Sequence, residues 1–149
     1  MKTVTFLLIA TAALSTSAEG SRSKRCLSGL ADVLTRAHFT GPIVCSSKDR
    51  TIRLVGRTSG AGYTVYDYRY RFLPHSQGVY HGGQRVLVFR GQKYAGQYVL
   101  SPPSLTNIEV NGNHLILRMP NSREHLTVDL SSIPPKRIHW NGMNAEFVR

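Results

Sequence analysis

The chain has 149 residues, and its 19 Lys and Arg side chains against 8 Asp and Glu give a net charge of +11 with neutral histidine. This length fits one ordinary domain rather than two. Hydrophobic residues make up 41% and charged residues 18%, which excludes both a disordered chain and an all-apolar membrane protein. The excess of cations favours anionic partners.

The first 18 residues have the composition of a signal peptide. Lys2 provides the positive start, residues 3–14 form an uncharged and mostly apolar run, and residues 15–18 are small. The run is too short to span a bilayer, and no second apolar stretch of spanning length follows, so we predict no stable membrane span. Cleavage after Ala18 would leave 131 residues with a net charge of +10. We therefore expect an exported protein, either periplasmic or extracellular.

A basic linker, residues 19–25, follows the signal segment. Its Arg22, Lys24 and Arg25 resemble a dibasic processing site, although a solvated linker is the simpler interpretation. We predict that residues 26–149 form a single domain.

The two cysteines, Cys26 and Cys45, lie near the start of this domain. In an exported protein, an even pair with no third thiol is most simply a disulfide. A metal site would use His38 between the two thiols, but no Cys-x-x-Cys motif or second nearby histidine completes a set of four ligands. We therefore predict a disulfide and assign no metal.

One amphipathic helix is predicted directly after the linker. Its apolar face follows the spacing i, i+3, i+4, i+7, i+11 and consists of Leu27, Leu30, Ala31, Leu34 and His38. We expect His38 to pack at the end of the helix, where a cation also suits the helix dipole. Gly41 and Pro42 then end the helix, because proline cannot continue it.

From Thr51 onward, short β-type runs alternate with Gly, Pro and Asn at intervals of roughly ten residues. The predicted strands are residues 51–55, 63–73, 85–90, 94–100, 106–110, 114–119, 126–130, 137–140 and 144–148. Asn111-Gly112 and Asn141-Gly142 each predict a tight hairpin through a type I′ turn. Connections this short leave no room for crossover helices. We therefore expect a mainly β fold with one N-terminal α-helix, in which an antiparallel meander forms a small sandwich or barrel.

The predicted strand at residues 63–73 separates aromatic from charged residues. One face carries Thr64, Tyr66, Tyr68, Tyr70 and Phe72, and the other carries Val65, Asp67, Arg69, Arg71 and Leu73. The simpler interpretation packs the aromatic face into the core and leaves the charged face in solvent, with Asp67 and Arg69 paired. The alternative exposes the tyrosines as a stacking platform toward which the arginines steer an anion.

The excess charge is concentrated between residues 51 and 100, which carry seven cations and one carboxylate. The cations are Arg53, Arg57, Arg69, Arg71, Arg85, Arg90 and Lys93. If the strands that carry them are neighbours, these side chains could form one basic patch for a phosphate, an anionic glycan or an acidic protein. The same composition also fits a basic outer face that only keeps the protein soluble.

A polar loop at residues 74–85 is the second candidate site. Gly82 and Gly83 could let backbone amides approach a ligand closely. His75 and His81 would support acid–base chemistry or metal binding only if the loop folds back on itself. Otherwise, the segment is a surface loop with exposed histidines.

No P-loop, nucleophile elbow, His-Glu-x-x-His motif or carboxylate pair occurs, so we assign no catalytic residue and no cofactor. We predict an exported binding protein whose basic surface takes an anionic ligand, a carbohydrate or an acidic protein. The residues predicted to bind the ligand are Arg69, Arg71, His75, His81, Gln84, Arg85, Tyr66, Tyr68 and Tyr70.

Two other functions stay open. A secreted basic ribonuclease could use His75, His81 and Glu109, with arginines holding the phosphate. A structural protein of the cell envelope would have no dedicated ligand. Nucleic acid fits the charge as a ligand, but no motif supports it.

Overall fold

The computed structural model describes residues 29–74, 78–100, 105, 107–140 and 142–149. The predicted signal peptide, the basic linker, Cys26, His75 and Asn141 lie outside these residues, so the export signal and the disulfide stay predictions. Within the described ranges, no helix has both the length and the apolar composition needed to cross a membrane.

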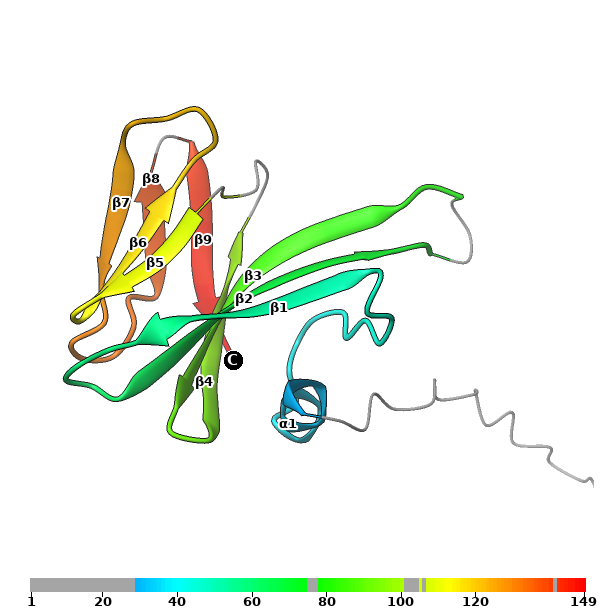
Figure 1. Ribbon diagram of the computed structural model, residues 1–149, viewed down its shortest axis with the longest axis horizontal. Helices are drawn as coiled ribbons and strands as arrows, with labels where there is room; N and C mark the ends of the chain where they lie inside the picture. The colour runs from blue at the N-terminus through cyan, green and yellow to red at the C-terminus, as the bar shows by residue number, and fades with distance from the viewer. Residues whose placement is uncertain (1–28, 75–77, 101–104, 106, 141) are drawn as a thin grey trace, which may run out of the picture.

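The described chain forms one short helix and then a succession of strands, as the sequence predicts (Figure 1). The elements are α1 (Leu30–Arg36), β1 (Arg50–Arg57), β2 (Tyr63–Phe72), β3 (His81–Arg90), β4 (Lys93–Leu100), β5 (Asn107–Asn111), β6 (His114–Arg118), β7 (His125–Asp129), β8 (Arg137–Trp140) and β9 (Met143–Val148). Each of the nine predicted strands therefore has a counterpart, with bounds that differ by a few residues.

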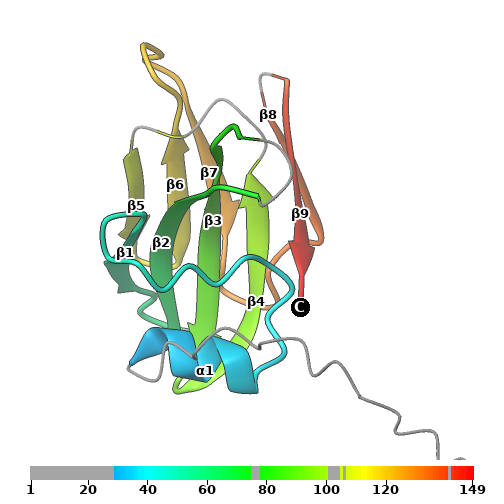
Figure 2. The same cartoon turned by 90° about the vertical axis from the view of Figure 1, so that its right-hand side faces the viewer.

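The strands form two antiparallel sheets. The larger sheet has six strands in the order β1-β2-β3-β4-β9-β8, and the smaller sheet has three in the order β5-β6-β7. Figure 2 shows the smaller sheet behind the larger one and α1 in front of it. The described strands are thus sandwich-like, and the two sheets do not close into a barrel.

The chain builds the larger sheet in two stages. Strands β1 to β4 form a meander in which each strand pairs with the next. The chain then leaves for the smaller sheet and returns as the β8–β9 hairpin, whose second strand pairs with β4. Antiparallel pairing throughout fits the short connections seen in the sequence.

The main hydrophobic core lies between the two sheets. It includes Val65, Val86 and Val88 from the larger sheet, together with Ile108 and Leu117 from the smaller one. All five side chains are almost completely buried. Burial of this apolar surface is the main force that holds the sheets together.

A second, smaller core lies on the opposite face of the larger sheet. Leu34 of α1 and Phe39 pack there against Tyr68, Leu87 and Phe89. The central strands are therefore covered on both faces, which explains why β3 contains the unbroken apolar run Val86–Phe89 rather than an alternating pattern.

The helix ends earlier than Gly41 and Pro42 predict. His38 has a φ of 54°, in the left-handed region. The amide of Phe39 donates to the carbonyl of Leu34 at 3.1 Å, and the amide of His38 donates to the carbonyl of Thr35 at 3.4 Å. These two bonds form a Schellman motif, which ends the helix and directs Phe39 back into the smaller core. His38 is consequently exposed and outside the helix.

Both predicted hairpins are present. In the β5–β6 hairpin, Asn111 pairs with His114, so the turn residues are Gly112 and Asn113 rather than Asn111 and Gly112. Of these, Gly112 has a positive φ of 57°. In the β8–β9 hairpin, Trp140 pairs with Met143. The tight hairpins are confirmed, but the first turn is shifted by one residue, and its single positive φ is typical of a type II′ turn.

Strand β3 begins four residues earlier than predicted, at His81. Gly82 and Gly83 are paired with Arg71 and Tyr70 of β2, so they belong to the sheet and not to a loop. A Cβ atom at Gly83 would lie 2.6 Å from the hydroxyl of Tyr70. The glycine is required there because the tyrosine ring crosses its backbone.

Candidate functional site

The three predicted ligand-binding tyrosines lie beneath α1 and the segment that follows it. Tyr68 is 1% exposed. Its hydroxyl donates to the carbonyl of Pro42 at 2.9 Å and accepts from the amide of Val44 at 3.1 Å. Tyr66 and Tyr70 are half-buried in the same cluster. An open stacking platform that includes Tyr68 is therefore ruled out, and the aromatic face packs into a core as the simpler interpretation expects.

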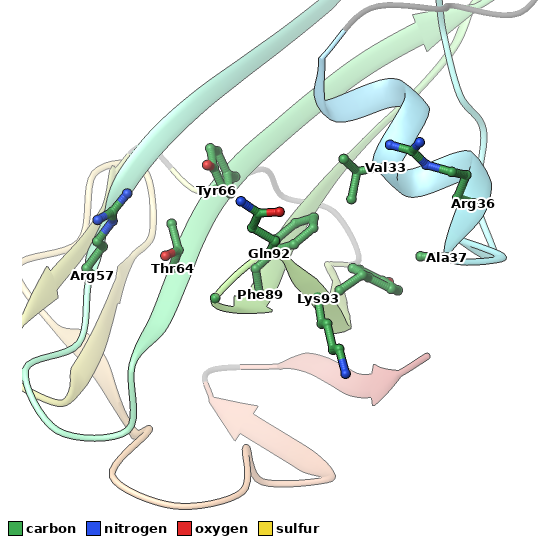
Figure 3. Close-up of a pocket in the computed structure, with 11 residues that line it drawn as sticks. Val33, Arg36, Ala37, Arg57, Thr64, Tyr66, Phe89, Gln92 and Lys93 are labelled. Carbon is green, nitrogen blue, oxygen red and sulfur yellow. The ribbon is translucent and has the colours of Figure 1, made fainter.

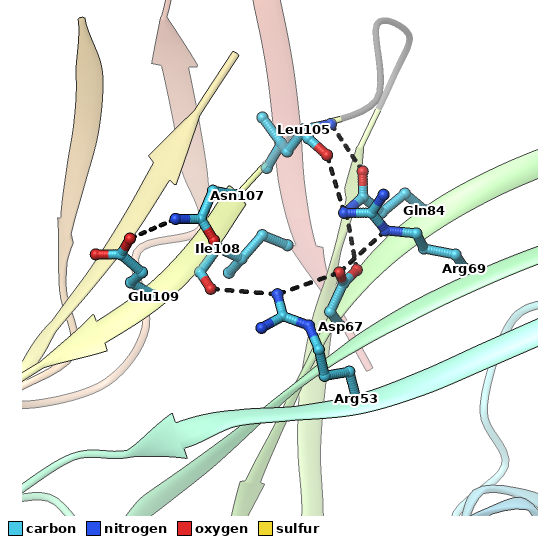
Figure 4. A network of polar contacts seen from close by, with 8 residues as sticks. All are labelled: Arg53, Asp67, Arg69, Gln84, Leu105, Asn107, Ile108 and Glu109. Atoms are coloured by element: carbon cyan, nitrogen blue, oxygen red, sulfur yellow. Dashed lines mark hydrogen bonds and ion pairs between the residues drawn. The ribbon is translucent and has the colours of Figure 1, made fainter. Parts of the chain in front are cut away.

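The opposite, charged face of β2 was expected in solvent, and this expectation is wrong at Asp67. Asp67 is only 2% exposed. It accepts from Arg69 Nε at 3.0 Å and from Gln84 Nε2 at 2.8 Å, and Arg53 lies 3.7 Å away (Figure 4). The predicted pair of Asp67 and Arg69 is present, but within a buried polar network.

This network connects the two sheets. Arg69 donates to the carbonyl of Leu105 at 3.0 Å, and the amide of Leu105 donates to Gln84 Oε1 at 2.8 Å. Arg53 donates to the carbonyl of Ile108 at 3.4 Å (Figure 4). Arg69 and Gln84, both predicted to bind a ligand, are therefore hydrogen-bonded to protein atoms, and the Arg69 side chain remains 41% exposed.

The other two predicted arginines also have protein partners. Arg71 Nε donates to the Asp49 carboxylate at 2.8 Å. Arg85 lies over the rings of Phe39 and Tyr70, at 5.5 and 5.8 Å from their centroids. Its guanidinium donates to Gln97 Oε1 at 3.0 Å. Arg85 thus connects the segment after α1, through Phe39 and the Thr40 carbonyl, to Gln97 of the sheet.

The residues of the ribonuclease alternative are not assembled in the part of the chain that the structure describes. His81 lies at the end of the β2–β3 hairpin, with its ring 5.9 Å from that of Phe72. Glu109 lies on β5 in the smaller sheet, where it accepts from Asn107 and pairs with Arg118 at 4.0 Å. His75 is outside the described residues.

The seven cations of residues 51–100 fall into two sets, those with protein partners and those without one among the described residues. Arg53, Arg69, Arg71 and Arg85 have the protein partners given above, whereas the side chains of Arg57, Arg90 and Lys93 have no hydrogen bond or ion pair to any described residue. These three lie together at one end of the sheet, where Arg57 pairs with Thr64 of β2 and Arg90 pairs with Lys93. This end therefore carries the uncompensated part of the charge.

A pocket of about 730 Å³ opens at the same end of the sheet, between β1, β2, the β3–β4 turn and α1. Arg57 and Lys93 line it, and Arg36 of α1 adds a third cation from the opposite side (Figure 3). None of the described residues that line it is an aspartate or glutamate. Arg36 does pair with Asp32 at 2.7 Å, on the surface of the helix. The pocket is consequently positive, with Arg57 and Lys93 available to a ligand.

The walls of the pocket are aromatic. Tyr66 and Phe89 meet edge to face with ring centroids 5.6 Å apart, and Phe89 meets Tyr94 at 5.5 Å. The Tyr94 hydroxyl is buried without a hydrogen-bond partner among the described residues, and burial raises the pKa of this hydroxyl. Thr64 and Gln92 add neutral polar groups (Figure 3). The site can therefore take a ligand that has both an anionic group and an apolar surface.

Sequence reasoning found only part of this site. The sequence pattern points to Tyr66 and includes Arg57 and Lys93 in the basic segment, but it does not point to Arg36. A weak signal was available, because Arg57 and Lys93 both lie next to glycine-containing turns that bring strand ends together. The contribution of α1 depends on how the helix packs across the sheet.

Comparisons with protein-family models, with curated proteins and with solved structures found no match for this chain. Among the described residues, no group of three or more His, Cys, Asp or Glu side chains is placed to hold a metal ion. The chemistry of the pocket is thus the basis for a functional assignment.

Proposed function

We propose that the protein is an exported binding module that takes an anionic ligand in the pocket between α1 and the β3–β4 turn. The observation that carries this proposal is that Arg36, Arg57 and Lys93 line one pocket with aromatic walls, to which the described part of the chain contributes no carboxylate. Hydrogen bonds to charged groups are stronger than neutral ones, so an anionic group would be held at the rim while its apolar part contacts the rings.

An anionic carbohydrate fits both features of the pocket, because aromatic walls suit a sugar ring and the cations suit its acidic groups. The direct test is calorimetric titration with a heparin-derived oligosaccharide and with its desulfated counterpart of equal length. We expect the sulfated compound to bind, and its affinity to fall as salt is added. Equal binding of both compounds would contradict an anion site.

The pocket is tested by the double variant Arg57→Ala/Lys93→Ala. Its affinity should fall by at least about tenfold, since one lost hydrogen bond to a charged group costs about 1.5 kcal/mol. The control Arg123→Ala/Lys136→Ala removes the same charge from exposed residues that do not line the pocket. The proposal fails if the pocket variant binds as the parent does, or if the control loses as much affinity.

Export and the disulfide belong to the same proposal. Amino-terminal sequencing of the secreted protein should begin at Glu19 if the signal peptide is cleaved after Ala18. A bond between Cys26 and Cys45 would close a loop of about twenty residues and stabilise the fold by roughly 3 kcal/mol. Thiol titration of the unreduced, denatured protein should find no free thiol, and finding two would refute the bond.

The ribonuclease alternative has its own test. The protein and its His75→Ala/His81→Ala variant are incubated with RNA under identical conditions. A binding module gives no cleavage above background in either sample. Cleavage by the parent that is lost in the variant would replace the binding proposal with a catalytic one.

A further inference from the structure

The end of the β2–β3 hairpin carries a group of exposed apolar side chains. Phe72, Leu73, Val79 and Tyr80 are 36, 48, 64 and 60% exposed, and we call these four residues the apolar tip. Figure 1 shows the hairpin extending away from the rest of the sheet toward this end. Exposed apolar groups that lie together on a soluble protein usually mark a surface that contacts a partner.

The side chains of the apolar tip point to both faces of the hairpin. The Phe72 ring stacks on Tyr70, with centroids 6.3 Å apart, on the face that α1 covers further along the sheet. Arg71, its neighbour, points to the opposite face and lies 5.4 Å from the centre of the Tyr80 ring. A rigid protein surface would cover one of these faces, whereas a lipid interface surrounds the end of a hairpin on all sides.

Cations lie directly behind the apolar tip. A shallow hollow of about 210 Å³ is lined by Lys48, Arg50, Arg69 and Arg71, and Asp49 is the one carboxylate among its described lining residues. Asp49 is paired with Arg71, and Lys48 is exposed, with no hydrogen bond or close ion pair to a described residue. The hollow has an excess of positive charge, and it adjoins the tip because Arg50 pairs with Tyr70 on β2.

We propose that the apolar tip inserts into the headgroup region of an anionic lipid bilayer. Phe72 and Leu73 lie further along the hairpin than the cations Arg69 and Arg71, so the cations would lie at the headgroups when the apolar tip enters the bilayer surface. Tyrosine prefers the membrane interface because it has an apolar ring and a polar hydroxyl. Cations beside an inserted segment add attraction to anionic headgroups.

This surface is separate from the anion pocket. Tyr66 is the pocket residue of β2 that lies nearest the tip, and about 20 Å of strand separates it from Phe72 at roughly 3.3 Å per residue. The two proposals therefore do not depend on each other. Changes at Arg57 and Lys93 should leave insertion of the tip intact.

The test is co-sedimentation of the full chain with vesicles of phosphatidylcholine, with and without phosphatidylglycerol. We expect binding to the anionic vesicles and much weaker binding to the neutral ones. The variant Val79→Ser/Tyr80→Ser should bind the anionic vesicles at least about tenfold more weakly, because it removes two apolar side chains from the interface. Lys48→Gln should weaken binding about fivefold, through the loss of one cation near the headgroups.

The matched control is Leu54→Ser/Ile133→Ser, which removes two exposed apolar side chains outside the tip. It should bind as the parent does. The proposal is overturned if the parent does not prefer anionic vesicles, or if the tip variant and the control behave alike. Absence of any vesicle binding would also overturn it and would leave a protein as the partner of the tip.

A spectroscopic measurement separates insertion from simple charge attraction. Tyr80→Trp in a Trp140→Phe background places the single tryptophan at the tip. Its emission should shift to the blue on anionic vesicles and should be quenched by lipids that are brominated in the acyl chain. Vesicle binding without the shift or the quenching would contradict insertion.

Discussion

The cations of residues 51–100 divide into two sets that the sequence does not distinguish. Arg53, Arg69, Arg71 and Arg85 bond to carboxylates, amides, hydroxyls or carbonyls of the protein, whereas Arg57, Arg90 and Lys93 have no such partner among the described residues. The first set contributes to the stability of the fold. The second set leaves positive charge at one end of the sheet, where the pocket lies.

The difference shows that a basic composition is not by itself a binding surface. Each of the four arginines in the first set donates a hydrogen bond to a protein atom. A ligand would have to compete with these contacts. At Arg57 and Lys93 it would compete with no hydrogen bond or ion pair from a described residue, so the two sets predict different results when residues are removed.

The largest expected effect is that of Asp67→Ala on stability. This change leaves Arg69 and the buried Gln84 without their partner, so the free energy of unfolding should fall by about 3 kcal/mol. Chemical denaturation of the variant and the parent measures this change in the free energy of unfolding. The control Asp32→Ala breaks the exposed pair with Arg36 and should cost about 0.5 kcal/mol or less. Equal losses in the two variants would remove the distinction between buried and exposed pairs.

Arg85→Ala should have the next largest effect, about 2 kcal/mol. It removes donors to Tyr70, to the Thr40 carbonyl and to Gln97, which is completely buried. Arg90→Ala is the matched control, because Arg90 is exposed and has no partner in the described chain. Its unfolding free energy should stay within about 0.5 kcal/mol of the parent. A larger loss in Arg90→Ala than in Arg85→Ala would contradict the assignment of the two sets.

Two tyrosines extend the comparison to uncharged groups. The Tyr98 hydroxyl donates to the carbonyl of Pro135 at 2.8 Å, so Tyr98→Phe should lower the unfolding free energy by about 1 kcal/mol. The Tyr94 hydroxyl is buried without a partner among the described residues, so Tyr94→Phe should raise it by about 1 kcal/mol. Denaturation curves of the two variants are the measurement. Changes of the same sign would show that the Tyr94 hydroxyl has a partner in solution.

The pocket cations should affect stability least. Arg57→Ala and Lys93→Ala should each change the unfolding free energy by less than about 0.5 kcal/mol, because neither side chain bonds to a described residue. The same variants are expected to weaken the binding of an anionic ligand. A loss of more than about 1 kcal/mol in either variant would place that residue in the first set.

The last prediction concerns pH at Asp49. The hydrogen bond from Arg71 lowers the pKa of this carboxyl below its ordinary value of 3.8. The ionised form is thus favoured by folding, so its contribution to stability is complete above pH 3.8 and is lost as the pH falls through the lowered pKa. In Arg71→Ala the pKa should return toward 3.8, as followed by carboxyl carbon NMR. An unchanged pKa would show that Arg71 does not bond to Asp49 in solution.

Much of the fold could be predicted because its signals are local. Turn residues such as Gly112 and Pro120 separate runs of β-type residues, and each predicted strand is present. The end of the helix was missed because His38, without being a glycine, takes the left-handed conformation. The start of β3 was missed because Gly82 and Gly83 resemble a loop in sequence, although they pair with β2.

The sequence by itself determined the strands, the hairpins, the antiparallel sheets and the segment that holds most of the charge, because each depends on residues that are neighbours in the chain. Only the tertiary structure decided which cations have partners. Arg69 is held by the carbonyl of Leu105 as well as by Asp67, and the pocket combines Arg36 of the helix with Lys93, which begins the distant strand β4. Hydrogen bonds and ion pairs require atoms within a few ångströms, and sequence spacing does not give such distances between separate elements.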